Sequence, residues 1–132
     1  MTETIRLIIA GSRDFNDYEL LKKEVDEFLF SEIVCNHYPD LTEETAVIEI
    51  VSGGARGADR LGEKYAEKNN LPVKCFIPDW EKHKKSAGYI RNEEMAKYSN
   101  YCIIFNLRRS KGSVHMANLA KKYNLGLKVI NL

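Results

Sequence analysis

Apolar residues along the chain change period repeatedly, from short continuous runs to helical spacing and back. Residues 5–10 form a short apolar run that stops at Gly11, which is typical of a buried strand. Apolar residues then recur at helical spacing as far as about Phe30, after a capping-box signature formed by Asn16 and Glu19. The pattern predicts a strand followed by a helix.

The same change of period repeats along the rest of the chain. It predicts further strands at 47–51, 73–77, 101–105 and 127–130, and helices at about 58–69, 86–98 and 113–123, with Ser86 capping the second of these helices. Residues 31–45 are expected to form a helix tail and an exposed loop, and residues 79–87 show no clear period. Alternating strands and helices predict an α/β fold with a mainly parallel five-stranded sheet and helices on both faces.

Length, charge and cysteine content narrow the class of protein. A chain of 132 residues fits one domain, 1–132, and its net charge of +1 argues against a diffuse basic surface, so nucleic acid is an unexpected partner. No signal-peptide pattern or membrane-spanning run is present, and Cys35, Cys75 and Cys102 are widely spaced. These features fit a cytoplasmic protein with reduced, buried thiols. Cys35 and His37 lack a second pair of ligands, so no metal site is expected.

A glycine-rich turn joins the second predicted strand to the next helix. The segment SGGARGAD, residues 52–59, carries Gly53, Gly54 and Gly57. At such a junction, backbone N–H groups and the positive end of a helix dipole can hold an anion, and a Cβ would block the close approach of a phosphate. Arg56 adds a forked, permanently charged donor. The same glycines could instead serve turn geometry alone, so a binding role depends on support from the other loops.

Arginines concentrate in the segments that follow the strands. Only Arg6 of the seven arginines falls within a predicted strand, and the others are Arg13, Arg56, Arg60, Arg91, Arg108 and Arg109. Because the strand-to-helix connections of a parallel sheet leave it at one edge, we expect these side chains to surround a crevice suited to a ligand with several anionic groups, such as a nucleotide. Trp80 and Tyr89 lie in or near that edge and could stack on a base, although a core or lid anchor is the commoner role for tryptophan.

Five segments in order resemble the motifs of one family: GSRDF (11–15), SGGARGAD (52–59), PDW (78–80), AGYIRNEEM (87–95) and SKGSVHM (110–116). They resemble the YspA-type (cpYpsA-related) branch of the SLOG superfamily, whose relatives include the DNA-processing protein A family and the "lonely guy" cytokinin-activating phosphoribohydrolases. The resemblance implies a Rossmann-like three-layer sandwich that binds nucleotides or nucleotide-derived signals. It implies a ligand class rather than a reaction, and no cofactor is expected.

The resemblance assigns ligand-binding residues to four loops. It implies Gly11, Ser12 and Arg13 at the first loop, Gly53, Gly54, Arg56, Gly57 and Asp59 at the second, Arg91 and Asn92 at the third, and Lys111, Gly112 and Ser113 at the fourth. The family more often has a GGT-like turn at the fourth loop, where Lys111 and Ser113 replace the second glycine and the threonine. Trp80 joins this set as the stacking candidate.

The catalytic residues of the phosphoribohydrolases are only partly matched. These enzymes pair an arginine with a glutamate shortly after the GT turn; Arg91 matches the arginine, but His115 or Met116 stands in place of the glutamate. Glycosidic cleavage needs a carboxylate to stabilise positive charge on the sugar, so hydrolysis by that pair is disfavoured. Asp59, Glu94 and His115 stay as weak catalytic candidates.

Two functional classes therefore stay open. The favoured one is a module that senses or sequesters a small nucleotide-like ligand, because binding needs only the glycine turns and arginines. The alternative is a hydrolase acting on an N-glycosidic or phosphoester bond of a nucleotide. Binding of single-stranded DNA is a weaker reading, and a homo-oligomer is compatible with the sequence.

Overall fold

Five parallel strands form one sheet in the order β3-β2-β1-β4-β5 in the computed structural model, which describes residues 3–31 and 46–132. The strands are β1 (Glu3–Gly11), β2 (Ala46–Ser52), β3 (Val73–Cys75), β4 (Tyr101–Asn106) and β5 (Gly126–Asn131). All four pairings are parallel, with Leu7 of β1 opposite Ile50 of β2 and Tyr101 of β4. The predicted five-stranded parallel sheet is confirmed.

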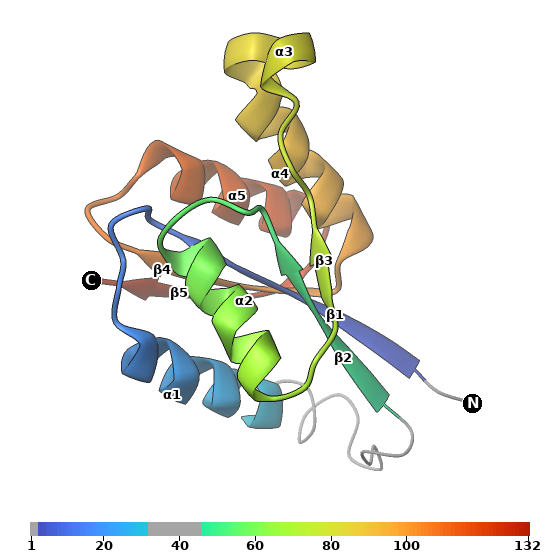
Figure 1. Cartoon of the computed structure of the whole chain (residues 1–132), viewed down its shortest axis with the longest axis vertical. Helices are drawn as coiled ribbons and strands as arrows, with labels where there is room; N and C mark the ends of the chain where they lie inside the picture. Colours follow the sequence, from blue (N-terminus) through green and yellow to red (C-terminus); the bar gives the residue numbers. More distant parts are fainter. Residues whose placement is uncertain (1–2, 32–45) are drawn as a thin grey trace.

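Helices cover both faces of this sheet (Figure 1). On one face α1 (Tyr18–Phe28) and α2 (Ala58–Lys68) share a core with the strands, in which Leu7 packs with Tyr65. On the other face α4 (Ala87–Tyr98) and α5 (Lys111–Lys122) build a second core, in which Ile8 packs with Met95 and Met116. Adjacent residues of β1 thus point to opposite layers, as strand geometry requires, and the architecture is a Rossmann-like three-layer α/β sandwich. Within the described residues, the helices are too short or too polar to cross a membrane.

The direction in which the chain winds reverses between β1 and β4. From β1 the chain passes through α1 to β2 and β3 on one side, and then returns through α4 to β4 and β5 on the other side. The helices that follow the neighbouring strands β1 and β4 lie on opposite faces, so the two connections diverge. Ligand crevices in open parallel sheets form at this point, outside the carboxyl ends of the strands.

Two helix starts differ from the prediction, and a third helix lacks the predicted side-chain cap. Asp17 rather than Asn16 caps α1, and its carboxylate, whose charge suits a helix N-terminus, accepts a hydrogen bond from the Leu20 N–H at 3.1 Å. α5 begins at Lys111 rather than at residue 113, because Ser110 is the N-cap. Ser86 precedes α4 without a side-chain capping bond, since residues Lys84–Ser86 already form a 3₁₀ turn, η2.

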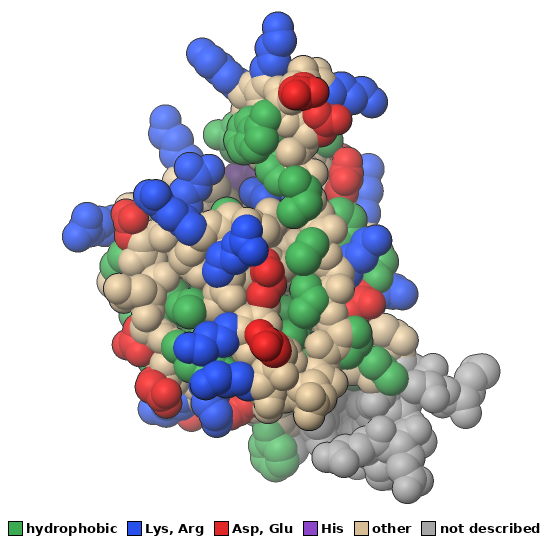
Figure 2. All heavy atoms as spheres, in the orientation of Figure 1, with side chains coloured by type: hydrophobic (Ala, Val, Ile, Leu, Met, Phe, Trp, Pro, Cys, Tyr) green, Lys and Arg blue, Asp and Glu red, His purple; other side chains and the backbone are tan. Residues whose placement is uncertain are grey.

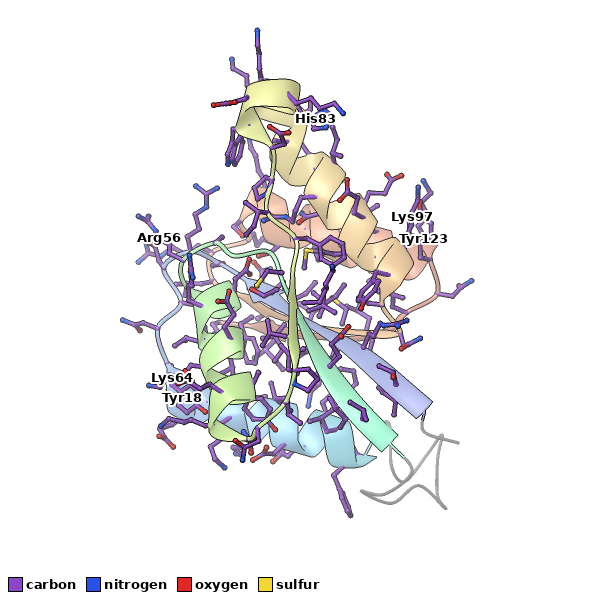
Figure 3. All side chains as sticks on the ribbon, turned by 45° about the vertical axis from the view of Figure 1, so that its right-hand side comes forward. Tyr18, Arg56, Lys64, His83, Lys97 and Tyr123 are labelled. Atoms are coloured by element: carbon purple, nitrogen blue, oxygen red, sulfur yellow. The ribbon has the colours of Figure 1, made fainter. Side chains whose placement is uncertain are left out.

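The connection after β3 contains a short helix, although its residues show no helical period in the sequence. β3 ends at Cys75, two residues before the predicted end, and the short helix α3 (Trp80–His83) follows. The Asp79 carboxylate caps α3 by accepting a hydrogen bond from the Lys82 N–H at 3.1 Å. α3 projects beyond the two helical layers (Figure 1), and His83 lies on it, far from Arg56 at the carboxyl edge of the sheet (Figure 3).

The expectation of buried cysteines is confirmed for Cys102 and wrong for Cys75. Cys102 lies in the middle of the sheet with no exposed surface, and burial raises the pKa of its thiol. Cys75 is exposed because all three residues of β3 are exposed at the edge of the sheet. Cys35 and His37 lie outside the described residues, so the structure does not bear on them.

Candidate ligand-binding site

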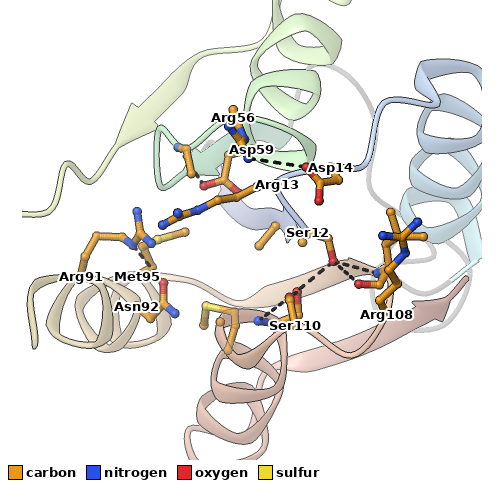
Figure 4. A pocket seen from close by; sticks show the side chains of 17 residues that line it. Ser12, Arg13, Asp14, Arg56, Asp59, Arg91, Asn92, Met95, Arg108 and Ser110 are labelled. Atoms are coloured by element: carbon orange, nitrogen blue, oxygen red, sulfur yellow. Dashed lines mark hydrogen bonds and ion pairs between the residues drawn. The ribbon is translucent and has the colours of Figure 1, made fainter. Parts of the chain in front are cut away.

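A cavity of about 440 Å³ opens where the connections after β1 and β4 diverge (Figure 4). It is lined by Ala10, Gly11, Ser12, Arg13, Asp14, Ala55, Arg56, Asp59, Arg91, Asn92, Met95, Leu107, Arg108, Ser110, Gly112, Ser113 and Met116. We call this cavity the serine cleft, after Ser12, Ser110 and Ser113. Residues expected at all four loops meet in it, which is the arrangement that the sheet topology predicts.

Ser12 ties the first loop to the fourth. Its buried hydroxyl donates to the Leu107 carbonyl at 2.9 Å and accepts from the Leu107 N–H at 2.8 Å. The loop can approach β4 this closely because Gly11 has no Cβ: one added there would lie 2.2 Å from the Phe105 carbonyl oxygen, and φ is +153°. The Ser12 hydroxyl therefore holds the wall of the cleft in place.

The N-terminus of α5 forms a second wall. The Ser110 hydroxyl donates to the Ser113 hydroxyl at 2.7 Å and accepts weakly from the Ser113 N–H at 3.4 Å. A Cβ added to Gly112 would meet no atom within 4 Å, so the helix backbone is open to the cleft there. Helix N-termini with accessible backbone bind anions readily. Lys111, in the same turn, is exposed and is not part of the lining.

The three glycines of the second loop have different roles. Gly57 has φ +83°, and a Cβ on it would lie 2.3 Å from the Ser12 carbonyl oxygen, so this glycine lets the second loop pack on the first. It lines neither this cleft nor its neighbour, described below. Gly54, with φ +73°, needs glycine for its backbone conformation and lines the neighbouring cleft, as does Gly53.

Arg91 and Asp59 approach each other across Gly53. Arg91 Nη1 donates to the Gly53 carbonyl at 2.6 Å, and Arg91 Nε donates to Asn92 Oδ1 at 2.9 Å. The Asp59 carboxylate accepts from the Ala55 N–H at 3.2 Å. A Cβ on Gly53 would lie 2.6 Å from Arg91 Nη1 and 2.8 Å from Asp59 Oδ2, so a larger residue here would displace the ends of these two side chains.

Burial shifts the pKa of both charged groups of this pair. It raises the pKa of the Asp59 carboxyl to about 6, although the Ala55 hydrogen bond and the charge of Arg91 oppose the shift. Burial also lowers the pKa of Arg91, an effect that Asp59 opposes and the like charge of Arg13 increases. The cleft therefore contains a carboxyl group that changes charge in a mildly acidic range beside guanidinium groups that stay charged.

Four arginines from four segments surround the serine cleft: Arg13, Arg56, Arg91 and Arg108. Arg56 makes an exposed ion pair with Asp14 at 3.6 Å. Figure 2 shows Lys and Arg side chains around the end of the molecule where the carboxyl edge of the sheet and α3 lie.

A second cavity of about 400 Å³ adjoins the first, and we call it the tryptophan cleft. It shares Arg13, Ala55, Arg56 and Arg91 with the serine cleft, and its other lining residues are Gly53, Gly54, Ile77, Pro78 and Trp80. The structure thus divides the predicted site residues, apart from Gly57 and Lys111, between two adjoining cavities.

The catalytic candidates do not come together. Asp59 lines the serine cleft, whereas Glu94 and His115 line a third hollow of about 360 Å³ with Tyr89. His115 Nδ1 lies 3.3 Å from Asn92 Nδ2, and its ring meets that of Tyr89 edge to face. Tyr89 therefore packs on His115 rather than joining Trp80.

The sequence does not identify several lining residues as site residues, among them Ser110, Asp14, Leu107 and Met95. Ser110 could have been predicted to cap the last helix. It stands three residues before Ser113, which is the spacing between an N-cap side chain and the backbone N–H that it binds. Leu107 and Met95 could not have been predicted as site residues, since apolar residues at these positions are equally typical of the core.

Comparison with solved structures finds a protein of the same fold. DNA processing protein A from Helicobacter pylori, described for its single-stranded DNA binding mode, superposes with a TM-score of 0.62 at 24% identity. The match covers 95% of this chain and 64% of that one, so this chain spans less than two thirds of its length. The near-neutral charge led us to expect that nucleic acid is an unlikely partner. This expectation is wrong, because a protein with the same fold binds single-stranded DNA.

Comparison of sequences identifies the family. The Gene 61 protein of Mycobacterium phage D29 is 34% identical over 132 residues, covering 96% of this chain and 94% of that protein. Residues 5–83, which hold the first two loops and the PDW segment, match the YspA, cpYpsA-related SLOG family, YAcAr. The chain belongs to the YspA, cpYpsA-related SLOG family.

Proposed function

We propose that the protein binds a nucleotide or nucleotide-derived ligand, and that the phosphate of this ligand occupies the serine cleft. The observation that carries the proposal is the convergence of four arginines and the open N-terminus of α5 on one cavity at the switch point of the sheet. Guanidinium forks match phosphate oxygens in pairs, and helix N-termini favour anions. The volume of about 440 Å³ is in the usual range for small-molecule sites, roughly 300 to 1,000 Å³.

Single-stranded DNA is the second candidate ligand. The fold shared with DNA processing protein A favours it, and a phosphodiester offers the same oxygens to the arginines. Salt distinguishes the two ligands, because a strand that contacts several phosphates loses affinity steeply as salt concentration rises. A mononucleotide should respond much less.

Hydrolysis of the bound nucleotide is the alternative activity, and Asp59 is its candidate acid. A carboxyl with a pKa of about 6 can hold a proton close to neutral pH, as general acids do. Turnover of AMP to free base or phosphate, detected by chromatography and lost in Asp59→Asn, would favour this activity over binding alone.

Thermal unfolding with AMP, ribose 5-phosphate and adenosine tests the proposal. AMP and ribose 5-phosphate should raise the melting temperature and adenosine should not, because a ligand at a hundred times its dissociation constant adds about 2.7 kcal/mol to stability. Arg91→Ala should weaken AMP binding by about 1.5–3 kcal/mol, and Arg91→Lys should restore only part of it, since lysine keeps the charge and loses the fork.

Arg60→Ala is the matched control for this experiment. Arg60 is an exposed arginine that pairs with Glu63 at 3.4 Å and lines neither cleft. If the folded Arg91→Ala and Arg60→Ala proteins bound AMP equally well, the serine cleft would not be the phosphate site.

A further inference from the structure

The serine cleft and the tryptophan cleft share one wall. Arg13, Arg56 and Arg91 line both cavities, and Ala55 completes the boundary between them. Each cavity alone has the size of a small-molecule site, roughly 300 to 1,000 Å³. A molecule lying across this boundary would have three guanidinium groups beside its middle and one cavity at each end.

The charges at this boundary favour an anion. Arg13 lies close enough to Arg91 to lower its pKa, and both arginines interact with Asp59. Asp59 balances one guanidinium of the pair, and the Asp14 carboxylate contacts the third, Arg56, at 3.6 Å in solvent. Since like charges held together raise the free energy of the site, a phosphate group between Arg13 and Arg91 would lower it.

Trp80, the first residue of α3, lines the tryptophan cleft. Trp80 is 53% exposed, although tryptophan is highly buried on average, and Ile77, which lines the same cleft, is 70% exposed. Asp79 caps the helix that carries Trp80, and the ring lies near Gly88 of α4, where an added Cβ would be 3.8 Å from it. The cleft therefore presents an aromatic ring, with Ile77 and Pro78, to a flat apolar group.

We propose that the ligand is of the dinucleotide class, with two nucleosides joined through a phosphate or pyrophosphate. Its phosphates occupy the part of the serine cleft beside Arg13, Arg56 and Arg91, one nucleoside extends further into that cleft, and the base of the other stacks on Trp80. This inference rests on the proposed function and extends it, because phosphate binding requires only the serine cleft. Small dinucleotides and short single-stranded DNA share this chemistry, and the experiment separates them.

The test compares ADP with diadenosine diphosphate, in which the pyrophosphate links a second adenosine and carries one negative charge fewer. Calorimetry should find that diadenosine diphosphate binds about tenfold more tightly, because stacking of a base on an aromatic side chain is worth roughly 1–3 kcal/mol. Trp80→Ala should remove this preference by weakening the binding of diadenosine diphosphate more than that of ADP, and Trp80→Phe should keep part of it. Tyr89→Ala is the control, since Tyr89 is an exposed aromatic that lines neither cleft.

Fluorescence gives an independent readout, because Trp80 is the single tryptophan of the chain. Diadenosine diphosphate should quench Trp80 emission, and ribose 5-phosphate should bind without quenching it. Equal affinities for ADP and diadenosine diphosphate, both unaffected by Trp80→Ala, would overturn this inference and leave the proposed function standing. Failure of all phosphate compounds to bind would instead overturn the proposed function. Quenching by oligothymidylate alone would overturn the small dinucleotide in favour of single-stranded DNA.

Discussion

Asp59 is a buried carboxylic acid in the wall of a cleft whose other charged groups are mostly arginines. Only 5% of its surface is exposed, and burial outweighs both the Ala55 hydrogen bond and the charge of Arg91, so its pKa rises from 3.8 to about 6. The folded protein therefore holds this proton more tightly than the unfolded chain does. The contribution of Asp59 to the free energy of unfolding is largest below pH 3.8, falls as pH rises to about 6, and is constant above that.

This shift predicts an effect of Asp59→Asn that depends on pH. Asparagine stays neutral and can still accept the Ala55 N–H, so the stability of the variant relative to the parent should rise by about 2.4 kcal/mol between pH 4 and pH 7, at roughly 1.4 kcal/mol per pKa unit. Urea denaturation of both proteins at pH 4 and pH 7 measures the difference in stability. The contributions of the other acidic residues are the same in both proteins and cancel. The same stability difference at both pH values would mean that Asp59 titrates normally.

Single residues also mark the limit of prediction from sequence. The position of Ser12 at the site could be predicted from its loop, but its bond to Leu107 joins residues 95 positions apart, and no local pattern encodes such a contact. Gly57 was predicted to approach a phosphate, and its observed contact is with the backbone at Ser12. A Gly57→Val variant would disturb the fold, so loss of binding in it would carry little information.

At the scale of helices, two glycines have opposite surroundings. A Cβ on Gly62 of α2 would lie 2.8 Å from the Cβ of Ile9, so α2 packs on β1 only because glycine stands there. A Cβ on Gly112 of α5 would meet nothing within 4 Å. Alanine stabilises a helix relative to glycine by up to about 1 kcal/mol. The surroundings of each glycine therefore decide whether its replacement by alanine raises or lowers the stability of the protein.

We therefore expect Gly62→Ala to lose about 1 kcal/mol of stability, because overpacking costs roughly 1–3 kcal/mol and exceeds the gain in helix propensity. Gly112→Ala should gain a few tenths to about 1 kcal/mol, and should weaken AMP binding because its methyl group enters the serine cleft. Urea denaturation and calorimetry of the two variants provide the comparison. A stabilised Gly62→Ala protein would contradict the close packing of α2 on β1.

The elements themselves were predictable where they are long and regular. The four long helices and five strands follow from hydrophobic period, whereas α3 has four residues and was predicted as a connection without period. Its cap at Asp79 could have been noticed, but a single capping residue does not predict a helix. The position of Trp80 in a cleft depends on α3, so that part of the site needed the structure.

For the whole molecule, alternation of strands and helices predicts the parallel sheet and places all the strand-to-helix loops at one edge. It does not give the strand order, which determines that the loops after β1 and β4 diverge and enclose the serine cleft. Nor does it show that Arg13, Arg56 and Arg91 belong to two cavities at once. Both properties depend on how distant segments pack.

The most direct test of the account is a map of backbone amide chemical shifts during titration of the ¹⁵N-labelled protein with pyrophosphate. If phosphate binds at the carboxyl edge of the sheet, the shifts should concentrate in the loops that hold Arg13, Gly53 and Gly112, with little change around Glu94 and His115. Concentrated shifts around Glu94 and His115 instead, or no shifts at millimolar pyrophosphate, would contradict the claim that this edge is a phosphate-binding site.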